Sequence, residues 1–140
     1  MKETLTKHLR LAVLEAAEEV QDEAKQTHRF KTKSGKLEDS VKVRSERDGL
    51  VGVVYLDESE APYARPVYFG TKPHIIAPKV RKALRWPSGN EFVFARMVRH
   101  PGTRPDSFLR EALRTKKTAI DAIFVRRTEL ALEEVANALR

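Results

Sequence analysis

The C-terminal stretch 104–140 has helical apolar spacing over more residues than one straight helix of a compact domain can hold. A single helix of that length would measure roughly 54 Å, whereas a compact domain of this size has a radius of gyration of ~14 Å. The helix therefore either breaks or projects to contact a partner chain. We expect a break between Thr115 and Thr118, where apolar residues are absent, and a helix start at Thr103, followed by Pro105 and Asp106 in the first turn.

Residues 1–26 are predicted to form the N-terminal helix. Apolar residues recur there at spacings of three and four, which places them on one face. This face becomes rich in alanine toward its end, so a neighbouring element can approach closely. Its members are Leu5, Leu9, Val13, Ala16, Val20 and Ala24. The polar and basic stretch 27–36 follows as an exposed loop.

The middle of the chain, 37–99, is predicted to form a sheet. Residues 37–44 alternate between apolar and polar side chains, which is typical of a strand with one face in water. A turn at Asp48 and Gly49 leads to the apolar run 50–56, which we expect to be buried on both faces, with a bulge at Gly52.

The stretch 57–80 is expected to be a long loop, because three of its four prolines interrupt any regular helix. They are Pro66, Pro73 and Pro78, and Ile75 with Ile76 can form at most a short or edge strand. A hairpin should follow, with strands at 82–86 and 92–98 joined by a turn at 87–90.

These elements predict an α+β fold and a single domain, 1–140. A curved, mostly antiparallel sheet of about four to five strands should pack against the N-terminal helix and the C-terminal helical region.

Positive charge is concentrated in the second half of the sheet region. The chain of 140 residues has a net charge of +7, and residues 72–100 alone carry seven basic side chains against one acidic, a net +6. Such a patch suits a nucleic-acid-binding hairpin at 79–99, with Trp86, Phe92 and Phe94 stacking on bases. We favour the simpler interpretation, in which these aromatic residues form the core face of the hairpin.

The sequence offers few groups for chemistry. The chain has no cysteine, which excludes disulfides and thiolate catalysis and fits a reducing, intracellular environment. Four histidines lie far apart, and we expect His8 and His28 to be exposed to solvent rather than to bind a metal. Acidic pairs are adjacent in sequence and more often face water than flank a substrate. We therefore expect no catalytic site, no cofactor, no metal and no membrane span.

A series of short motifs runs through the chain in a specific order. The first is Lys-Ser-Gly-Lys-Leu-Glu-Asp-Ser-Val at 33–41, and Tyr63 with Ala64 follows. Val-Tyr-Phe-Gly-Thr occupies 67–71, His-Pro-Gly-Thr-Arg-Pro occupies 100–105, and Phe108 with Leu109 completes the series. The chain thereby resembles the tail-completion proteins of long-tailed phages and prophages, including head–tail joining, neck and minor tail protein Z-like proteins, which are related in fold to tail terminators.

The resemblance implies a structural role in virion assembly. Such a protein would form or join a ring, commonly of six copies, at the head-proximal end of the tail. Its partners would be copies of itself and the tail tube and neck proteins. Its location would be the virion, and the host cytoplasm during assembly. A small prophage-encoded regulator that binds a host protein is a further alternative.

Two groups of residues are candidates for this role. The expected subunit or partner contacts lie in the basic loop, the Pro-rich stretch and the hairpin: Arg29, Lys31, Lys33, Lys36, Tyr68, Lys79, Arg81, Arg85 and Arg96. The motif residues expected to hold the fold are Gly35, Leu37, Tyr63, Ala64, Gly70, Thr71, Pro101, Gly102, Phe108 and Leu109. Tyr68 stands where many relatives carry an acidic residue, so we expect the loop around it to be held differently.

Overall fold

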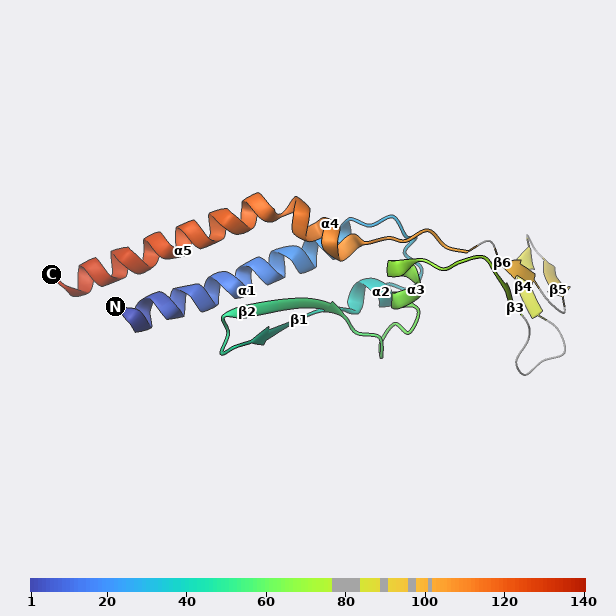
Figure 1. Cartoon of the computed structure of the whole chain (residues 1–140), viewed down its shortest axis with the longest axis horizontal. Helices are drawn as coiled ribbons and strands as arrows, with labels where there is room; N and C mark the ends of the chain where they lie inside the picture. Colours follow the sequence, from blue (N-terminus) through green and yellow to red (C-terminus); the bar gives the residue numbers. More distant parts are fainter. Residues whose placement is uncertain (77–83, 89–90, 96–97, 101) are drawn as a thin grey trace.

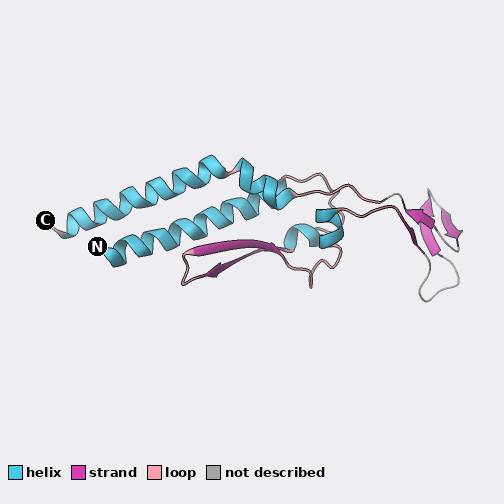
Figure 2. Ribbon diagram, in the orientation of Figure 1, coloured by secondary structure: helices cyan, strands magenta, loops and turns pink. Residues whose placement is uncertain are grey.

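The computed structural model describes residues 1–76, 84–88, 91–95, 98–100 and 102–140. The described part is an α+β fold with helices at both ends of the chain and strands between them (Figures 1 and 2). In chain order the elements are α1 (Lys2–Gln26), α2 (Lys36–Asp39), β1 (Val41–Glu46), β2 (Val51–Leu56), α3 (Ala64–Phe69), β3 (His74–Ile76), β4 (Leu84–Ser88), β5 (Glu91–Ala95), β6 (Val98–His100), α4 (Phe108–Thr115) and α5 (Lys117–Ala138).

Three layers make up the body of the molecule. Figure 1 shows α1 between α5 on one side and the β1–β2 hairpin on the other. Both long helices are antiparallel neighbours, and the two chain ends lie close together. A narrow arm extends away from this body and carries β3 to β6.

Small residues on α1 allow its neighbours to approach closely. Four alanines are buried on it, and Ala12 and Ala24 are completely inaccessible to solvent. The side of α1 toward the hairpin accepts Gly52 of β2, where an added Cβ would lie 3.1 Å from Val13 and 3.2 Å from Ala17. The predicted alanine-rich face is therefore confirmed, although Leu5, placed on the same face, is exposed.

Ion pairs join α1 to the C-terminal helices along its length. Glu15 accepts hydrogen bonds from Arg127, and Glu19 pairs with Lys116 at 3.2 Å. Glu134 contacts Lys7 at 3.2 Å and His8 at 2.7 Å. The C-terminal helix therefore packs against its own chain rather than projecting away from it.

The predicted break in the C-terminal helical region is confirmed. Lys116 separates α4 from α5, within the expected interval. The predicted helix start is wrong, because α4 begins at Phe108. Thr103 instead pairs with Thr71, and the carboxylate of Asp106 accepts hydrogen bonds from a distant loop rather than from the first turn of a helix.

The expected sheet of four to five strands is wrong. The described strands form three separate two-stranded antiparallel sheets, β1 with β2, β3 with β6 and β4 with β5. The strand predicted from residue 37 begins at Val41, because residues 36–39 form a turn of helix after Gly35, whose φ is +79°. Asp48 and Gly49 do form the β1–β2 turn, with φ values of +57° and +83°.

The β2 strand differs from its prediction in two ways. It is only partly buried, because α1 covers one of its faces and the other has no layer on it within the described chain. Gly52 forms no bulge, since it lies in regular register opposite Ser45. This glycine serves close packing against α1 rather than a change in strand direction.

Part of the predicted loop 57–80 is helical. Helix α3 includes Pro66, which is tolerated because it lies in the first turn, where its missing N–H has no helical acceptor. The short strand at 75–76 is confirmed as β3. In the hairpin, Pro87 and Ser88 belong to strand β4 instead of the turn, and Gly89 and Asn90 lie outside the described residues.

Candidate functional site

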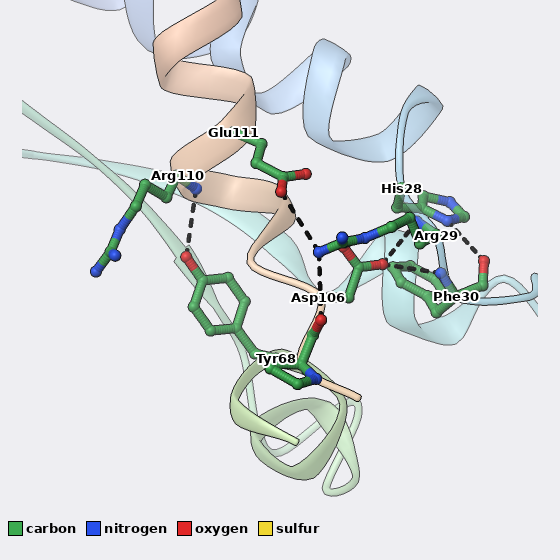
Figure 3. Close-up of polar contacts among 8 residues, drawn as sticks. His28, Arg29, Phe30, Tyr68, Asp106, Arg110 and Glu111 are labelled. Atoms are coloured by element: carbon green, nitrogen blue, oxygen red, sulfur yellow. Dashed lines mark hydrogen bonds and ion pairs between the residues drawn. The ribbon is translucent and has the colours of Figure 1, made fainter. Parts of the chain in front are cut away.

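The junction between body and arm is organised by the buried carboxylate of Asp106. This residue is 3% exposed, and its Oδ2 accepts hydrogen bonds from the backbone N–H groups of Arg29 (2.7 Å) and Phe30 (2.8 Å), as Figure 3 shows. The Arg29 guanidinium lies 3.6 Å from the other carboxylate oxygen and also contacts Glu111 at 3.4 Å. The loop after α1 is thereby fixed to the start of α4.

Aromatic rings fill the space beneath this polar network. Phe108 is completely buried, and its ring lies 5.1 Å from that of Phe30 and 5.6 Å from that of Tyr68. His28 stacks on Phe30 at 3.6 Å, and its Nδ1 donates to the carbonyl oxygen of Phe30 at 2.8 Å. These contacts join segments that lie far apart in the sequence.

Tyr68 belongs to this internal cluster. Its hydroxyl oxygen accepts a hydrogen bond from the backbone N–H of Arg110 at 3.3 Å (Figure 3). Tyr68 was predicted as a partner contact, but its ring packs inside the chain and connects α3 to α4. The expectation that the loop is held by something other than an acidic residue agrees with this arrangement.

Two glycines let the two strands of the arm pair side by side where they leave the body. Thr71 and Thr103 exchange two backbone hydrogen bonds of 3.0 Å. Gly70, with φ of +75°, lies so close to this pair that an added Cβ would be 2.6 Å from the carbonyl oxygen of Thr103. A Cβ added to Gly102, with φ of +89°, would come closer still to the carbonyl oxygen of Thr71. Both positions therefore require glycine.

The basic loop lies on the surface beside this junction. Lys31, Lys33 and Lys36 are exposed, as predicted for a contact surface. Arg29 is also exposed, but its guanidinium donates to the carbonyl oxygen of Pro105 at 3.2 Å and serves the internal network. The structure therefore divides the predicted basic cluster into three outward lysines and one arginine that holds the junction.

The remaining predicted motif residues hold the fold in different ways. Leu37 and Ala64 are buried in a small core with Ala61, whereas Tyr63 is 44% exposed. Leu109 packs against the main core beside Phe108. Pro101 lies outside the described residues.

The predicted basic hairpin is described only in part. Lys79, Arg81 and Arg96 lie outside the described residues, and Arg85 is placed by its backbone alone, opposite Phe94 in β4–β5. The nucleic-acid alternative therefore stays a prediction. Backbone pairing places His74 opposite His100 in β3–β6.

An open groove of about 630 Å³ runs along the body. Its floor is the alanine-rich side of α1, and its walls come from β2 and from α4 with the start of α5. The apolar lining includes Val13, Ala17, Val54, Leu113 and Phe124. It contains no constellation of acids, bases or nucleophiles that could act together on a substrate.

The described residues hold no group of three or more acidic, histidine or cysteine side chains suited to a metal ion. His8 was expected to be exposed, which is wrong: it is 7% exposed and bonded to Glu134. His28 is also partly buried rather than fully solvated. Within the described chain, no helix combines the length and apolar character that crossing a bilayer requires.

The body contains the segment that matches a known protein family. Residues 1–70 match the family HK97-gp10-like, described as "Bacteriophage HK97-gp10, putative tail-component". The chain belongs to this family. The match confirms the resemblance to phage tail proteins, and it ends at Gly70, where the arm begins. No curated protein and no solved structure matches the chain.

The matched part of this HK97-gp10-like protein includes α1, the basic loop, the β1–β2 hairpin and α3. Two features of the molecule were missed from sequence. Asp106 was assigned to a helix start, although a lone acid before a buried aromatic residue can equally accept hydrogen bonds from another loop. Exposed apolar residues on α5 were also missed, although Val125, Leu132 and Leu139 recur at intervals of seven.

Proposed function

We propose that this HK97-gp10-like protein is a structural tail-completion or neck component that forms or joins a ring at the head-proximal end of a phage tail. Membership of a phage tail-component family carries the proposal. The proposed role needs no catalysis, because binding between subunits and to the tail tube is sufficient for it. We place the protein in the virion, after assembly in the host cytoplasm.

The shape and surface of the chain support this role. An elongated body with a protruding arm (Figure 2) offers separate surfaces for several neighbours. Many large apolar side chains remain exposed on the body, among them Leu14 (47%), Leu113 (55%) and Leu132 (61%). Large apolar side chains left exposed in this way favour contacts with partner proteins.

Electron microscopy tests the proposal directly. Negative-stain images of the purified full chain should show closed rings of one diameter, and native mass spectrometry should give one subunit number. In phage particles carrying a tagged copy of the chain, gold label should lie at the junction of head and tail. A chain that is monomeric at every soluble concentration, and absent from the particles, would contradict the proposal.

A further inference from the structure

One apolar face of α5 points away from its own chain. Val125 is 58% exposed, Leu132 61% and the terminal Leu139 83%. Helical spacing places them on one side, away from Arg127, whose guanidinium contacts Glu15 of α1. Among the exposed charged residues of this stretch, Asp121 lies on this side of the helix and Glu129 beside it, whereas Arg126 and Glu133 lie further round. We call this surface the helix face, defined by Val125, Leu132 and Leu139.

The β1–β2 hairpin carries a second apolar face, whose residues are half-buried and which no helix or sheet of the described chain covers (Figure 1). Gly52, Val54 and Leu56 point toward α1 and the core, so strand alternation turns the intervening residues outward. We call this surface the sheet face, defined by Val51, Val53 and Tyr55. A strand that is apolar on both faces is typically covered on both faces. The sequence of β2 therefore predicts a second covering layer, which the described chain does not supply.

Three basic residues border the sheet face, together with the exposed Glu46, which lies directly across from Val51. Lys42 and Arg44 lie directly across from Tyr55 and Val53 on β1, and the exposed Arg47 follows in the turn. The Arg44 guanidinium lies 5.0 Å from the centre of the Tyr55 ring and 3.0 Å from Glu46, and Lys42 pairs with Glu60 at 3.0 Å. These pairs are exposed to solvent, so they can exchange for other carboxylates at little cost.

The two faces therefore match in character but cannot meet within one chain. One is apolar with acidic residues beside it, and the other is apolar with basic residues beside it. Helix α1 separates them, because it lies between α5 and the hairpin (Figure 1). A second copy of the chain can present the partner face that the first copy cannot reach.

We infer that the helix face of one copy packs on the sheet face of the next. The inference rests on the proposed ring function and specifies which surfaces form the subunit contact. Such a contact is heterologous, so each open assembly retains one unused face of each kind until a ring closes. Acidic residues of α5 then oppose Lys42, Arg44 and Arg47, which fixes the orientation of the two subunits.

Two variants that each remove one face test this arrangement. Leu132→Asp places a charge in the helix face, and Val53→Asp places one in the sheet face. Each variant alone should be monomeric by size-exclusion chromatography with light scattering, with self-association weakened at least tenfold. Mixed together they should form a one-to-one dimer, because one intact face of each kind remains, and no larger species.

Matched controls separate loss of contact from loss of fold. Leu130→Asp introduces the same change on α5 at a 37% exposed position outside the helix face, and it should assemble like the natural chain. Circular dichroism should show equal helix content in all four proteins.

A pair of introduced cysteines tests the proposed contact by cross-linking it instead of disrupting it. The chain has no cysteine, so Val53→Cys with Leu132→Cys creates the only two thiols. Because α1 lies between them, oxidation should give disulfide-linked dimers and higher multiples, and none should form when Cys replaces Leu130 instead of Leu132.

The outcomes separate this inference from the proposed function. Rings that persist in both Asp variants, or variants that fail to form the mixed dimer, contradict the pairing of these faces and leave the ring itself intact. A natural chain that does not assemble, together with a Val53→Cys, Leu132→Cys chain that forms no disulfide-linked dimers, contradicts both.

Discussion

Replacing Asp106 with Ala tests whether one buried carboxylate holds the junction of body and arm. The substitution removes the acceptor for two backbone N–H groups, those of Arg29 and Phe30. A hydrogen bond to a charged group contributes ~1.5–3 kcal/mol, and water can reach the exposed side of Arg29. We therefore expect the free energy of unfolding to fall by about 3 kcal/mol, with the melting temperature lower by about 10 °C.

Urea unfolding followed by circular dichroism measures this loss. Arg29→Ala is the matched control, because it removes the ion pair to Asp106 but keeps the backbone N–H. That side chain is 66% exposed, so its loss should cost less than about 1 kcal/mol. Asp106→Asn retains one acceptor oxygen and should lie between the two. An Asp106→Ala cost below about 1 kcal/mol, or an equal cost for Arg29→Ala, would refute the reasoning.

Three further predictions concern the glycine at the base of the arm, the core and the two long helices. Gly70→Ala should destabilise the chain by at least about 1–2 kcal/mol, because the φ of Gly70 is +75° and the new methyl group meets the Thr103 carbonyl oxygen. Thermal unfolding measures this loss, and an unchanged melting temperature would contradict the prediction. Phe108→Ala should cost about 3–5 kcal/mol in urea unfolding, since the ring is completely buried, and a loss under about 1 kcal/mol would show that it is not central to the core. His8 and Lys7 hold the pKa of Glu134 below its ordinary value of 4.5. This contribution to stability is therefore present above pH 4.5 and is lost as pH falls through the lowered pKa. Glu134→Gln should consequently make the free energy of unfolding depend less on pH in acid. Parallel pH profiles for the variant and the natural chain would contradict the prediction.

Local sequence patterns predicted those parts of the fold that depend on neighbouring residues. The N-terminal helix, the turn at Asp48 and Gly49 and the break near Lys116 each depend on spacing or backbone preference within a few residues. Gly35 was also expected to supply backbone freedom, and its φ of +79° agrees. The strand predicted to start at Leu37 was wrong over its first residues, because a helix of four residues is too short to show the 3.6-residue period that distinguishes a helix from a strand.

Long-range contacts were the features that sequence could not supply. Thr103 and Asp106 form a plausible helix start, but pairing with Thr71 and with the loop at Arg29 takes both residues away from it. His8 was expected in water because it lies beside the apolar face of α1, yet Glu134, 126 positions away, covers it. Such partners are set by packing of distant segments, which no local pattern encodes.

The sequence predicted which residues lie at the candidate site better than it predicted what each of them contacts. Lys31, Lys33 and Lys36 are exposed as expected, whereas Arg29 and Tyr68 also form hydrogen bonds within the chain, and contacts with a partner stay a prediction for all of them. Assigning them to a contact surface relied on charge and ring size alone. Only the structure shows which of these side chains already form contacts within the chain.

The pairing of Thr71 with Thr103 has a consequence for how such a protein can vary. Because the two residues already face each other as in a hairpin, a two-residue turn is enough to connect them. The segment between them can therefore be lengthened, shortened or exchanged for another module without changing where either strand enters the three-layered body. One scaffold can in this way carry different attachments, each fitted to a different neighbour.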